Sequence, residues 1–379
     1  MRILIITTQD KFFISHVKER ALYFKKQGCV VGVAAQQTSP FLSEEIRSCG
    51  FVFYDTKIER RSVNPLSELL SLLRLLQIQK HFRPDVSYHL GAKAIFYGTL
   101  TARLSDNKVK IVNAPIGLGY VFASNSILAK LLRPITMYLY RYFLNPSKSR
   151  VIIENDDDIK FFVRHKCLNP KDAFCILGAG VNTSTFVPIK QTRKNSICTV
   201  VMVSRLIKEK GVWDFVSVAN KLYDNNVNVR MVLVGEPDFG NPSSITKKEY
   251  EEIQNNPAVE CIGFKKNVLP FLQEAHIFCL PSYYREGLPR ALIEATSVGL
   301  AILTTDTVGC KEVVRERNGF LFPPHDVKKL FTLIEFLVEN PKEREKMGKL
   351  SRQVALRYFD SSLICKRTYQ VIMELYKSY

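Results

Sequence analysis

Residues 280–295 read Leu-Pro-Ser-Tyr-Tyr-Arg-Glu-Gly-Leu-Pro-Arg-Ala-Leu-Ile-Glu-Ala, at the end of an apolar run that begins at Ala275. We expect the run to be a strand, the polar stretch a loop, and Pro289 the first residue of a helix, where its missing N–H goes unused. Gly287 lets the backbone of the loop approach a ligand closely. Free amides at a helix start, with the helix dipole behind them, favour phosphate oxygens. The stretch therefore predicts a strand–loop–helix unit with a phosphate site at its loop.

Two carboxylates frame this predicted phosphate site. Glu286 lies in the loop, and Glu294 lies about a turn and a half into the helix. Carboxylates are poor phosphate ligands, but they accept hydrogen bonds from hydroxyls. A phosphate site flanked by two acids is therefore typical of nucleotide-sugar binding. The alternative is an ordinary amphipathic helix with one exposed acid and one capping acid.

A second strand-to-helix segment carries cations. Residues 197–203 are rich in β-branched side chains, as in a strand, and residues 204–211 read Ser-Arg-Leu-Ile-Lys-Glu-Lys-Gly before a helical pattern. Arg205 and Lys210 thus share one loop, at the sheet edge where ligands of open parallel sheets collect. Two fixed cations can neutralise a diphosphate, Arg through a planar fork and Lys as a point charge. A solvated lysine-rich loop, which Lys208 also suits, is the alternative.

The two motifs together resemble those of a known enzyme family. Glu286 and Glu294 enclose seven residues around Gly-Leu-Pro, similar to the E-x7-E signature of the retaining glycosyltransferase family 4. Arg205 and Lys210 match the cations of that family's S-R-L-x-x-x-K-G stretch. The resemblance implies the GT-B fold, with the active site in the cleft between two Rossmann-like domains. Further segments resemble a bacterial subgroup that assembles surface polysaccharides on lipid carriers: residues 85–103, 112–122, 234–238, 304–312 and 318–324.

The resemblance also implies roles for single residues. Arg205 and Lys210 would stabilise the leaving diphosphate, which is electrostatic catalysis that needs no strong nucleophile. Glu286 would hold the hydroxyls of the sugar, and His89 would lie beside the transferred sugar, with a purely structural histidine as the alternative. The other candidates are Glu294, Gly287 and Leu288 for the donor, and His16, Asn113, Gly117 and Gly119 on the acceptor side.

One segment departs from the family pattern. Many members have a Gly-Gly pair in the first strand-to-helix loop, where this chain reads Thr7-Thr8-Gln9-Asp10-Lys11-Phe12. The close backbone approach that glycine allows is therefore not expected at this loop.

Strand and helix patterns alternate along the chain, which implies doubly wound parallel sheets covered on both faces. The pattern stops at a loop rich in Gly, Thr and Pro, residues 178–195, and then restarts. We therefore predict an α/β protein with two doubly wound Rossmann-like domains, residues 1–185 and 190–358. By the family resemblance the first binds the acceptor, the second binds the nucleotide-sugar, and a helix at about 360–379 crosses back to the first domain. Strands are expected at residues 3–7, 29–34, 51–53, 86–88, 109–113, 151–154, 199–203, 230–234, 259–262, 277–280 and 301–304.

Length and composition agree with two cytosolic domains. The chain of 379 residues is too long for one compact domain, and 46% hydrophobic residues suffice for two cores. Nine cysteines without a C-x2-C pair favour reduced thiols over disulfides or a zinc site. The N-terminal residues fit a strand better than a signal peptide, and no apolar run approaches the roughly 20 residues of a membrane span. We expect a cytoplasmic protein, held peripherally at the cytoplasmic face of the inner membrane.

The net charge of +18 is concentrated in the first half of the chain. Residues 1–190 hold 27 Lys and Arg against 14 Asp and Glu, whereas residues 191–379 hold 27 against 22. A basic half suggests an anionic partner. Residues 127–144 mix Lys130, Arg133 and Arg141 with aliphatic and aromatic side chains, as in a helix that lies among lipid headgroups. A core helix with snorkelling cations is the alternative.

A second apolar helix is expected over residues 63–82. Its leucines recur at helical spacing, and we expect this stripe to lie in the core and not against a membrane.

Asp156, Asp157 and Asp158 resemble the metal-binding D-x-D motif of a different glycosyltransferase fold. They follow a predicted strand and precede a helical pattern, so helix capping is the preferred interpretation. We expect no metal ion and no other cofactor, since a nucleotide-sugar would be a substrate.

The prediction is a retaining, metal-independent hexosyl- or N-acetylhexosaminyltransferase. It would move a sugar from a nucleotide diphosphate, expected to be UDP, to a lipid-linked saccharide or a polyprenyl diphosphate in surface polysaccharide synthesis. An anionic membrane surface is a further expected partner. A two-lobed nucleotide-sugar epimerase is the alternative enzyme. A nucleic-acid-binding protein would need aromatic and basic recognition modules that the sequence lacks, so we expect no nucleic-acid partner.

Overall fold

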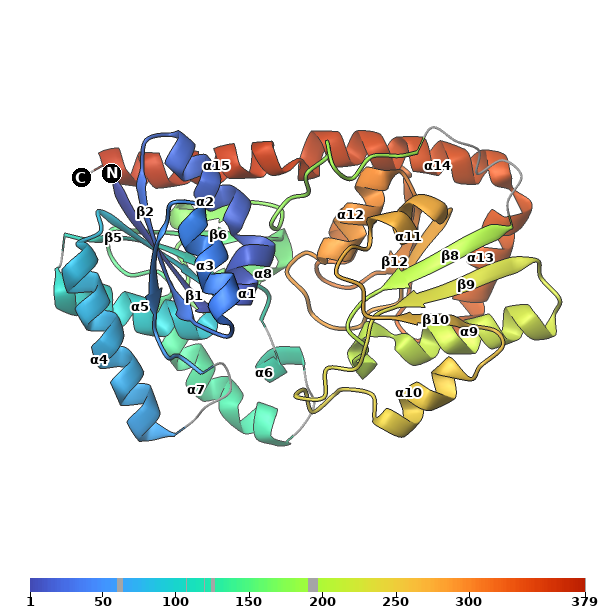
Figure 1. Ribbon diagram of the computed structural model, residues 1–379, viewed down its shortest axis with the longest axis horizontal. Helices are drawn as coiled ribbons and strands as arrows, with labels where there is room; N and C mark the ends of the chain where they lie inside the picture. The colour runs from blue at the N-terminus through green and yellow to red at the C-terminus, as the bar shows by residue number, and fades with distance from the viewer. Residues whose placement is uncertain (60–63, 107, 119, 124–126, 190–196, 379) are drawn as a thin grey trace. The chain divides into compact units, whose positions relative to one another are not determined.

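The computed structural model describes residues 1–59, 64–106, 108–118, 120–123, 127–189 and 197–378. The chain forms two compact units, residues 1–179 with 361–379, and residues 180–360 (Figure 1). Each unit contains one sheet, and every strand pairing within the two sheets is parallel. The prediction of two parallel-sheet α/β domains is confirmed.

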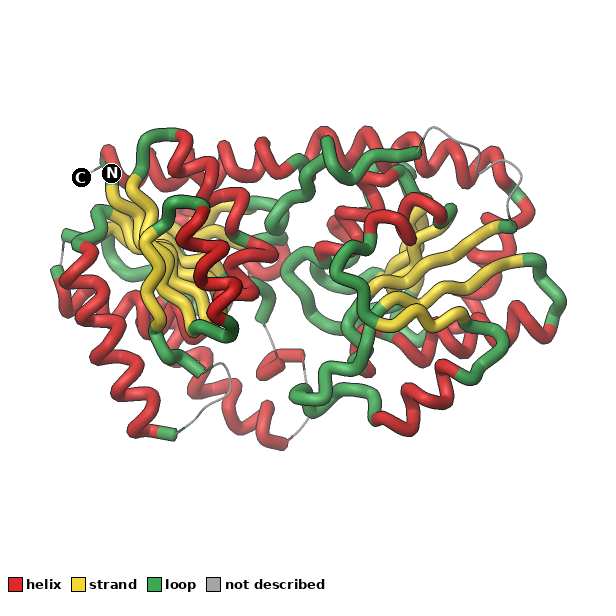
Figure 2. The backbone as a smooth tube through the Cα atoms, viewed as in Figure 1, coloured by secondary structure: helices red, strands yellow, loops and turns green. Residues whose placement is uncertain are grey.

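The first unit has a seven-stranded sheet in the order β3-β2-β1-β4-β5-β6-β7. Figure 2 shows helices on both sides of this sheet, as its buried apolar strands require. Its strands are β1 (Arg2–Gln9), β2 (Val30–Gln36), β3 (Val52–Asp55), β4 (Val86–Leu90), β5 (Lys110–Ala114), β6 (Ser149–Ile153) and β7 (Ala173–Cys175). Its helices are α1 (Asp10–His16), α2 (Lys18–Lys26), α3 (Pro40–Ser48), α4 (Pro65–Phe82), α5 (Ala92–Ser105), α6 (Tyr120–Ala123), α7 (Ile127–Phe143), α8 (Asp156–Arg164) and α15 (Ser361–Lys377).

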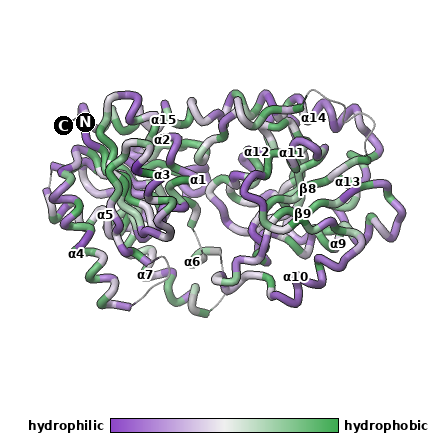
Figure 3. Tube along the Cα trace, in the orientation of Figure 1, coloured by the Kyte–Doolittle hydropathy of each residue, from purple (hydrophilic) through white to green (hydrophobic). Residues whose placement is uncertain are grey.

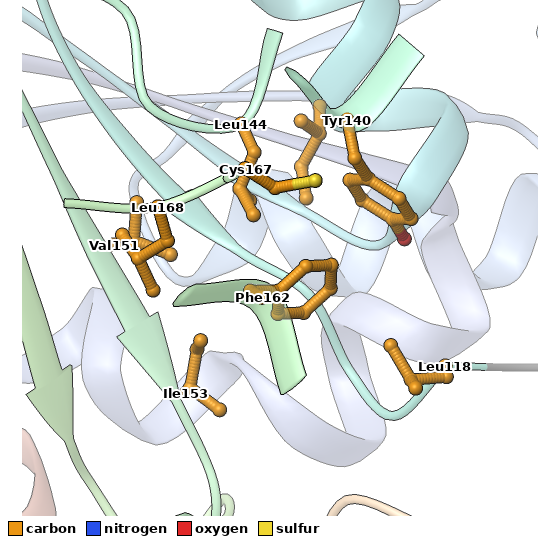
Figure 4. Close-up of a cluster of buried hydrophobic side chains, with 9 residues drawn as sticks. Leu118, Tyr140, Leu144, Val151, Ile153, Phe162, Cys167 and Leu168 are labelled. Carbon is orange, nitrogen blue, oxygen red and sulfur yellow. The ribbon is translucent and has the colours of Figure 1, made fainter. Parts of the chain in front are cut away.

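Apolar side chains fix the helices of the first unit to its sheet. One buried cluster joins α7, α8 and β6, and Figure 4 shows Tyr140 of α7 and Leu144, the residue after this helix, converging with Val151, Ile153 and Phe162. A second cluster joins β1, α4 and α5. The C-terminal helix α15 packs against α2, β5 and β6, so the last residues of the chain belong to the first unit.

The second unit has a six-stranded sheet in the order β10-β9-β8-β11-β12-β13. Figure 3 shows hydrophobic residues along its strands, which are buried between helices. Its strands are β8 (Cys198–Val203), β9 (Val229–Val234), β10 (Glu260–Gly263), β11 (Ile277–Leu280), β12 (Ala301–Thr305) and β13 (Gly319–Phe322). Its helices are α9 (Val212–Asp224), α10 (Lys247–Gln254), α11 (Leu269–Glu274), α12 (Arg290–Val298), α13 (Val327–Glu339) and α14 (Pro341–Val354).

Two strands were not predicted, β7 and β13. Both are edge strands of three or four residues, and they are only partly buried. Short edge strands carry a weak apolar signal, because they have a neighbouring strand on one side only.

Among the described residues, no helix is both long enough and apolar enough to cross a bilayer.

Candidate active site

The two predicted loops of the second unit leave the carboxyl ends of neighbouring strands. β8 leads into residues 204–211 and β11 into residues 281–289, and the two strands pair in parallel. Gly211 has a φ of 75°, and a Cβ atom there would lie 2.1 Å from the carbonyl oxygen of Pro281. No larger residue fits at that distance. The glycine therefore explains how residues 204–211, the cationic loop, come into contact with residues 281–289, the acidic loop.

This contact brings Lys210 and Glu286 together. Lys210 Nζ lies 2.5 Å from Glu286 Oε1, and the Ser282 hydroxyl donates to the same oxygen over 3.0 Å. The two charged side chains are only 11% and 14% exposed, so water and salt screen this ion pair less than a surface pair. Two motifs 76 residues apart therefore supply one site.

Glu209 connects the same two loops through its backbone. Its carbonyl oxygen accepts hydrogen bonds from the amides of Tyr283 (2.9 Å) and Tyr284 (3.1 Å) and from the Ser282 hydroxyl (3.2 Å). Its carboxylate accepts a hydrogen bond from Ser243. Glu209 was not among the predicted site residues, although its place beside Lys210 was a usable signal.

Arg205 lies on the more exposed side of the cationic loop. Its Nη1 is 2.6 Å from Asp238 Oδ2, with the two side chains 49% and 26% exposed. Asp238 belongs to residues 236–245, a segment that follows β9 and hydrogen-bonds to the cationic loop. This pairing could not be predicted from the sequence, because nothing local links residues 33 positions apart.

Helix α12 begins one residue later than predicted. Pro289 is the N-cap, with extended backbone angles, and Arg290 is the first helical residue. Glu294 is almost fully buried in this helix, and Arg290 Nε donates to its Oε1 over 2.7 Å. Burial raises the pKa of Glu294, and the charge of Arg290 opposes that rise. A buried carboxylate held by one exposed arginine is suited to accepting further hydrogen bonds from ligand hydroxyls.

A third loop, which follows β12, contacts the acidic loop at two positions. Gly309 has a φ of 85°, and a Cβ atom there would lie 2.4 Å from the carbonyl oxygen of Gly287. The Thr307 hydroxyl donates to the carbonyl oxygen of Ser282 over 3.1 Å. Gly287 is buried and Leu288 is half-buried, so the predicted donor-binding backbone is held in place by this loop.

In the first unit, the structure speaks against the role predicted for His89. The residue lies within β4 and is completely buried. Its Nδ1 is 2.7 Å from Asn113 Oδ1 and its Nε2 is 2.7 Å from the Ser87 hydroxyl, so both ring nitrogens are engaged. A Cβ atom on Gly98 would lie 2.5 Å from the ring. No substrate can reach this imidazole without opening the core, and the alternative of a structural histidine is the better account.

Asn113 is also a core residue and not an exposed acceptor contact. It is fully buried in β5, directly opposite His89 in the strand register. Its Nδ2 donates to the carbonyl oxygens of Phe143 and Leu144, each over 2.8 Å. It therefore anchors the end of α7 to the sheet.

Burial lowers the pKa of His89 to about 4, so the imidazole is neutral at pH 7.

Two of the other acceptor-side candidates, His16 and Gly117, lie at the carboxyl edge of the first sheet. His16 is half-buried at the end of α1 and stacks on Phe12, with ring centroids 4.6 Å apart. It lines a small pocket together with Arg20 and Glu154, two residues that the sequence analysis missed. Arg20 is buried and donates to the Tyr88 hydroxyl over 2.9 Å. Gly117 follows β5 with a φ of 61°, and Gly119 lies outside the described residues.

The first strand-to-helix junction has no loop. α1 starts at Asp10, directly after β1, and the Asp10 carboxylate accepts hydrogen bonds from the amides of Lys11 (2.7 Å) and Thr38 (2.8 Å). The side chain ties this junction to the segment after β2. The amide that a glycine-rich loop would offer to a ligand is thus used by Asp10.

The three aspartates of the possible metal motif form the first turn of α8. Asn155 is the N-cap and accepts a hydrogen bond from the amide of Asp158 over 2.8 Å. The capping residue is therefore Asn155, and the aspartates after it complement the helix dipole. In the part of the chain that the structure describes, no three His, Cys, Asp or Glu side chains group as metal ligands.

Two family models together match most of the chain. Residues 2–155 match the family described as glycosyl transferase 4-like, and residues 188–354 match glycosyl transferases group 1. The chain belongs to the glycosyltransferases that these two models describe. The resemblance seen in the acidic and cationic motifs is confirmed, and the protein is a glycosyltransferase.

Similar bacterial proteins have names that refer to lipid-linked glycans. The N,N'-diacetylbacillosaminyl-diphospho-undecaprenol α-1,3-N-acetylgalactosaminyltransferase of Campylobacter jejuni is 27% identical over 337 residues, 86% of each chain. The UDP-Gal:α-D-GlcNAc-diphosphoundecaprenol α-1,3-galactosyltransferase of Escherichia coli is 24% identical over 281 residues, 70% of each chain. This glycosyltransferase thus resembles bacterial enzymes that are named for acceptors linked to undecaprenol through a diphosphate.

Solved structures share the fold. HepE of Anabaena in complex with UDP has a TM-score of 0.78 at 16% identity, and the match covers 99% of this chain and 100% of HepE. WaaG, a glycosyltransferase involved in lipopolysaccharide biosynthesis, has a TM-score of 0.72 at 14% identity, with coverage of 97% and 99%. The predicted GT-B fold is confirmed.

Proposed function

We propose that this glycosyltransferase moves a sugar from a nucleotide diphosphate, most simply UDP, to a lipid-linked saccharide or a polyprenyl diphosphate. The observation that carries the proposal is the junction of the two loops, where Lys210 and Glu286 lie 2.5 Å apart at the start of the segment that leads into α12. The names of the Campylobacter and Escherichia relatives supply the acceptor class and a hexosyl or N-acetylhexosaminyl group.

In this proposal the second unit binds the donor. Arg205 and Lys210 hold the diphosphate and neutralise the charge that develops as the leaving group departs. Glu286 accepts hydrogen bonds from the sugar, and the buried Glu294 accepts them from the ribose, with the backbone of Gly287 and Leu288 near the phosphates. Each carboxylate is already held by a cation, which fixes its direction before the ligand arrives.

We further propose that the transfer retains the anomeric configuration and needs no metal ion. Two positive side chains on one loop can supply the charge that a divalent cation supplies elsewhere. A same-face substitution assisted by the leaving group does not need a basic residue beside the transferred sugar, the role predicted for His89. The first unit, with His16 and Arg20 at its pocket, is the proposed acceptor side.

The first unit also presents an apolar surface that fits the proposed membrane partner. The outer face of α7 carries Ile127, Leu131, Ile135, Tyr138 and Tyr142, which are between 56% and 78% exposed. Their spacing places them on one side of the helix, opposite the buried Tyr140 and Leu144. Exposed apolar rows of this kind mark an interaction site, not a folded core.

Charge and a second helix extend this surface. Lys130 and Arg141 are exposed on α7, Arg133 is half-buried, and the helix contains no acidic residue. The expectation of a core position for the leucines of α4 is wrong for Leu66, Leu69, Leu70 and Leu73, which are 49% to 72% exposed. Apolar side chains surrounded by cations suit the headgroup layer of an anionic bilayer. We propose reversible association with the cytoplasmic face of the membrane.

The proposed function is tested by transfer with and without acceptor. The protein is incubated in excess EDTA with a panel of nucleotide-sugars, and donors that raise the melting temperature are then offered to a polyprenyl-diphosphate acceptor. The proposal expects a glycosylated lipid and release of nucleoside diphosphate only when acceptor is present. Free nucleotide or a changed donor sugar without acceptor would instead favour the epimerase.

A further inference from the structure

Both cations proposed to bind the diphosphate are paired with carboxylates of the second unit. Lys210 contacts Glu286 at 2.5 Å, and Arg205 contacts Asp238 at 2.6 Å. The four formal charges cancel. Each cation is shown in one contact with its carboxylate and has further N–H donors, so a diphosphate that binds the same cation competes with the carboxylate for its charge.

The exposure of the two pairs decides which one opens. Lys210 and Glu286 are 11% and 14% exposed, and separating them would leave two poorly hydrated charges, which is strongly unfavourable. Arg205 and Asp238 are 49% and 26% exposed, so water can solvate both groups after separation. Arg205 is therefore the cation that changes partner.

The backbone keeps Asp238 beside Arg205 whether or not their side chains touch. The amide of Leu206 donates to the carbonyl oxygen of Glu236 over 2.9 Å, and the amide of Lys208 donates to that of Ser243 over 2.8 Å. These bonds hold residues 236–245 along the cationic loop on both sides of Asp238. The carboxylate thus stays at a high local concentration relative to Arg205.

We propose that Asp238 is a specificity-determining residue that competes with the diphosphate of the donor for Arg205. The inference rests on the proposed donor site. A multiply charged diphosphate displaces Asp238, whereas a neutral sugar or a glycan without phosphate has no group that can. Asp238 lowers the affinity for the donor and in exchange rejects ligands that lack the diphosphate.

The test is the UDP affinity of Asp238→Asn, measured by calorimetry. The variant keeps the shape of the side chain and removes its charge, and we expect it to bind UDP about two- to fivefold more tightly, in line with the modest strength of exposed ion pairs. Asp224→Asn is the matched control, because it removes the same charge from the same unit at the far end of α9. In an Arg205→Ala background, Asp238→Asn should no longer change the UDP affinity.

Unchanged or weaker UDP binding by Asp238→Asn would overturn the inference. The same gain in the Arg205→Ala background would also overturn it, because Asp238 would then act through its long-range field and not through Arg205. If the parent protein binds neither UDP nor pyrophosphate, the proposed donor site itself fails, and the inference fails with it. A parent that binds UDP without a gain in the variant refutes the competition alone.

Discussion

Three candidate residues of the second unit follow strands, whereas two central candidates of the first unit lie inside strands. Arg205, Lys210 and Glu286 follow the last residues of β8 and β11, and the structure brings Lys210 and Glu286 into contact. His89 and Asn113 lie within β4 and β5, where both side chains are completely buried. In a parallel sheet covered on both faces, a strand residue is buried whichever way it points. A reactive side chain has to follow the strand to be available.

The largest effect expected from this comparison is on catalysis by the loop cations. Arg205→Ala and Lys210→Ala should each reduce turnover about 100-fold or more, the loss typical of one preorganised contact to developing charge. Lys208→Ala is the matched control, since Lys208 shares the loop and is 52% exposed without a contact to the acidic loop among the described interactions. Steady-state kinetics of the three variants measure the difference. Near-normal turnover of Arg205→Ala or Lys210→Ala would refute the diphosphate assignment.

His89 should behave as a structural residue with a pH signature. Its folded pKa of about 4 lies below the ordinary value of 6.5, so between these values the unfolded chain binds more protons. The stability that the neutral imidazole provides is complete above pH 6.5 and is lost as the pH falls towards 4, by up to about 3 kcal/mol. Denaturant unfolding at several pH values measures this dependence.

Two observations separate this role from a catalytic one. His89→Asn should flatten the pH dependence of unfolding, whereas His81→Gln on the exposed side of α4 should not. An NMR titration of the parent should give a His89 pKa below 5. A loss of turnover in folded His89→Asn as large as that of Lys210→Ala would restore the catalytic role and break the comparison between loop and strand.

The two carboxylates of the second unit should divide their work. Glu294→Gln should weaken UDP binding about tenfold, as expected for the loss of charged hydrogen bonds to hydroxyls. Glu286→Gln should leave UDP binding nearly unchanged and depress sugar transfer. Calorimetry with UDP and a transfer assay distinguish the two effects. Equal loss of UDP affinity in both variants would contradict the assignment of ribose to Glu294 and sugar to Glu286.

The smallest effects concern the apolar surface of the first unit. Replacing Lys130, Arg133 and Arg141 with Gln should weaken binding to anionic vesicles at low salt, since each cation near such a surface contributes about 1 kcal/mol. Leu66→Ser with Leu70→Ser on α4 should also weaken it, whereas Leu356→Ser, at a leucine of the second unit that is 50% exposed, should not. Co-sedimentation measures binding. Undiminished binding by both variants would show that neither helix contacts the bilayer.

The sequence predicted the alternation of strands and helices because buried parallel strands are nearly continuous apolar runs. It also predicted that Arg205, Lys210 and Glu286 follow strands, because each motif is contiguous with an apolar run. The residues that contact the cationic loop from other parts of the chain could not be predicted from the sequence. Asp238 and Ser243 come from a segment after a different strand, and only the folded backbone places them beside the cationic loop.

The sequence also did not predict which apolar side chains of a helix are exposed. The leucines of α4 have a helical spacing that a core helix would also show. The periodicity predicts which side of the helix is apolar, but it does not predict whether other parts of the protein pack against that side. In the structure, Leu75, Ile78 and Phe82 pack on the sheet, while Leu66, Leu69, Leu70 and Leu73 stay exposed.

Arg205 and Lys210 are proposed to recognise the terminal phosphate of the donor nucleotide. Calorimetry in excess EDTA tests this by comparing UDP with UMP, for the parent and for the double variant Arg205→Ala, Lys210→Ala. The parent should prefer UDP clearly, about tenfold or more for a charge-assisted contact, and the double variant should bind both equally. A preference for UDP that survives the loss of both cations, or that appears only when a divalent metal is added, would contradict it.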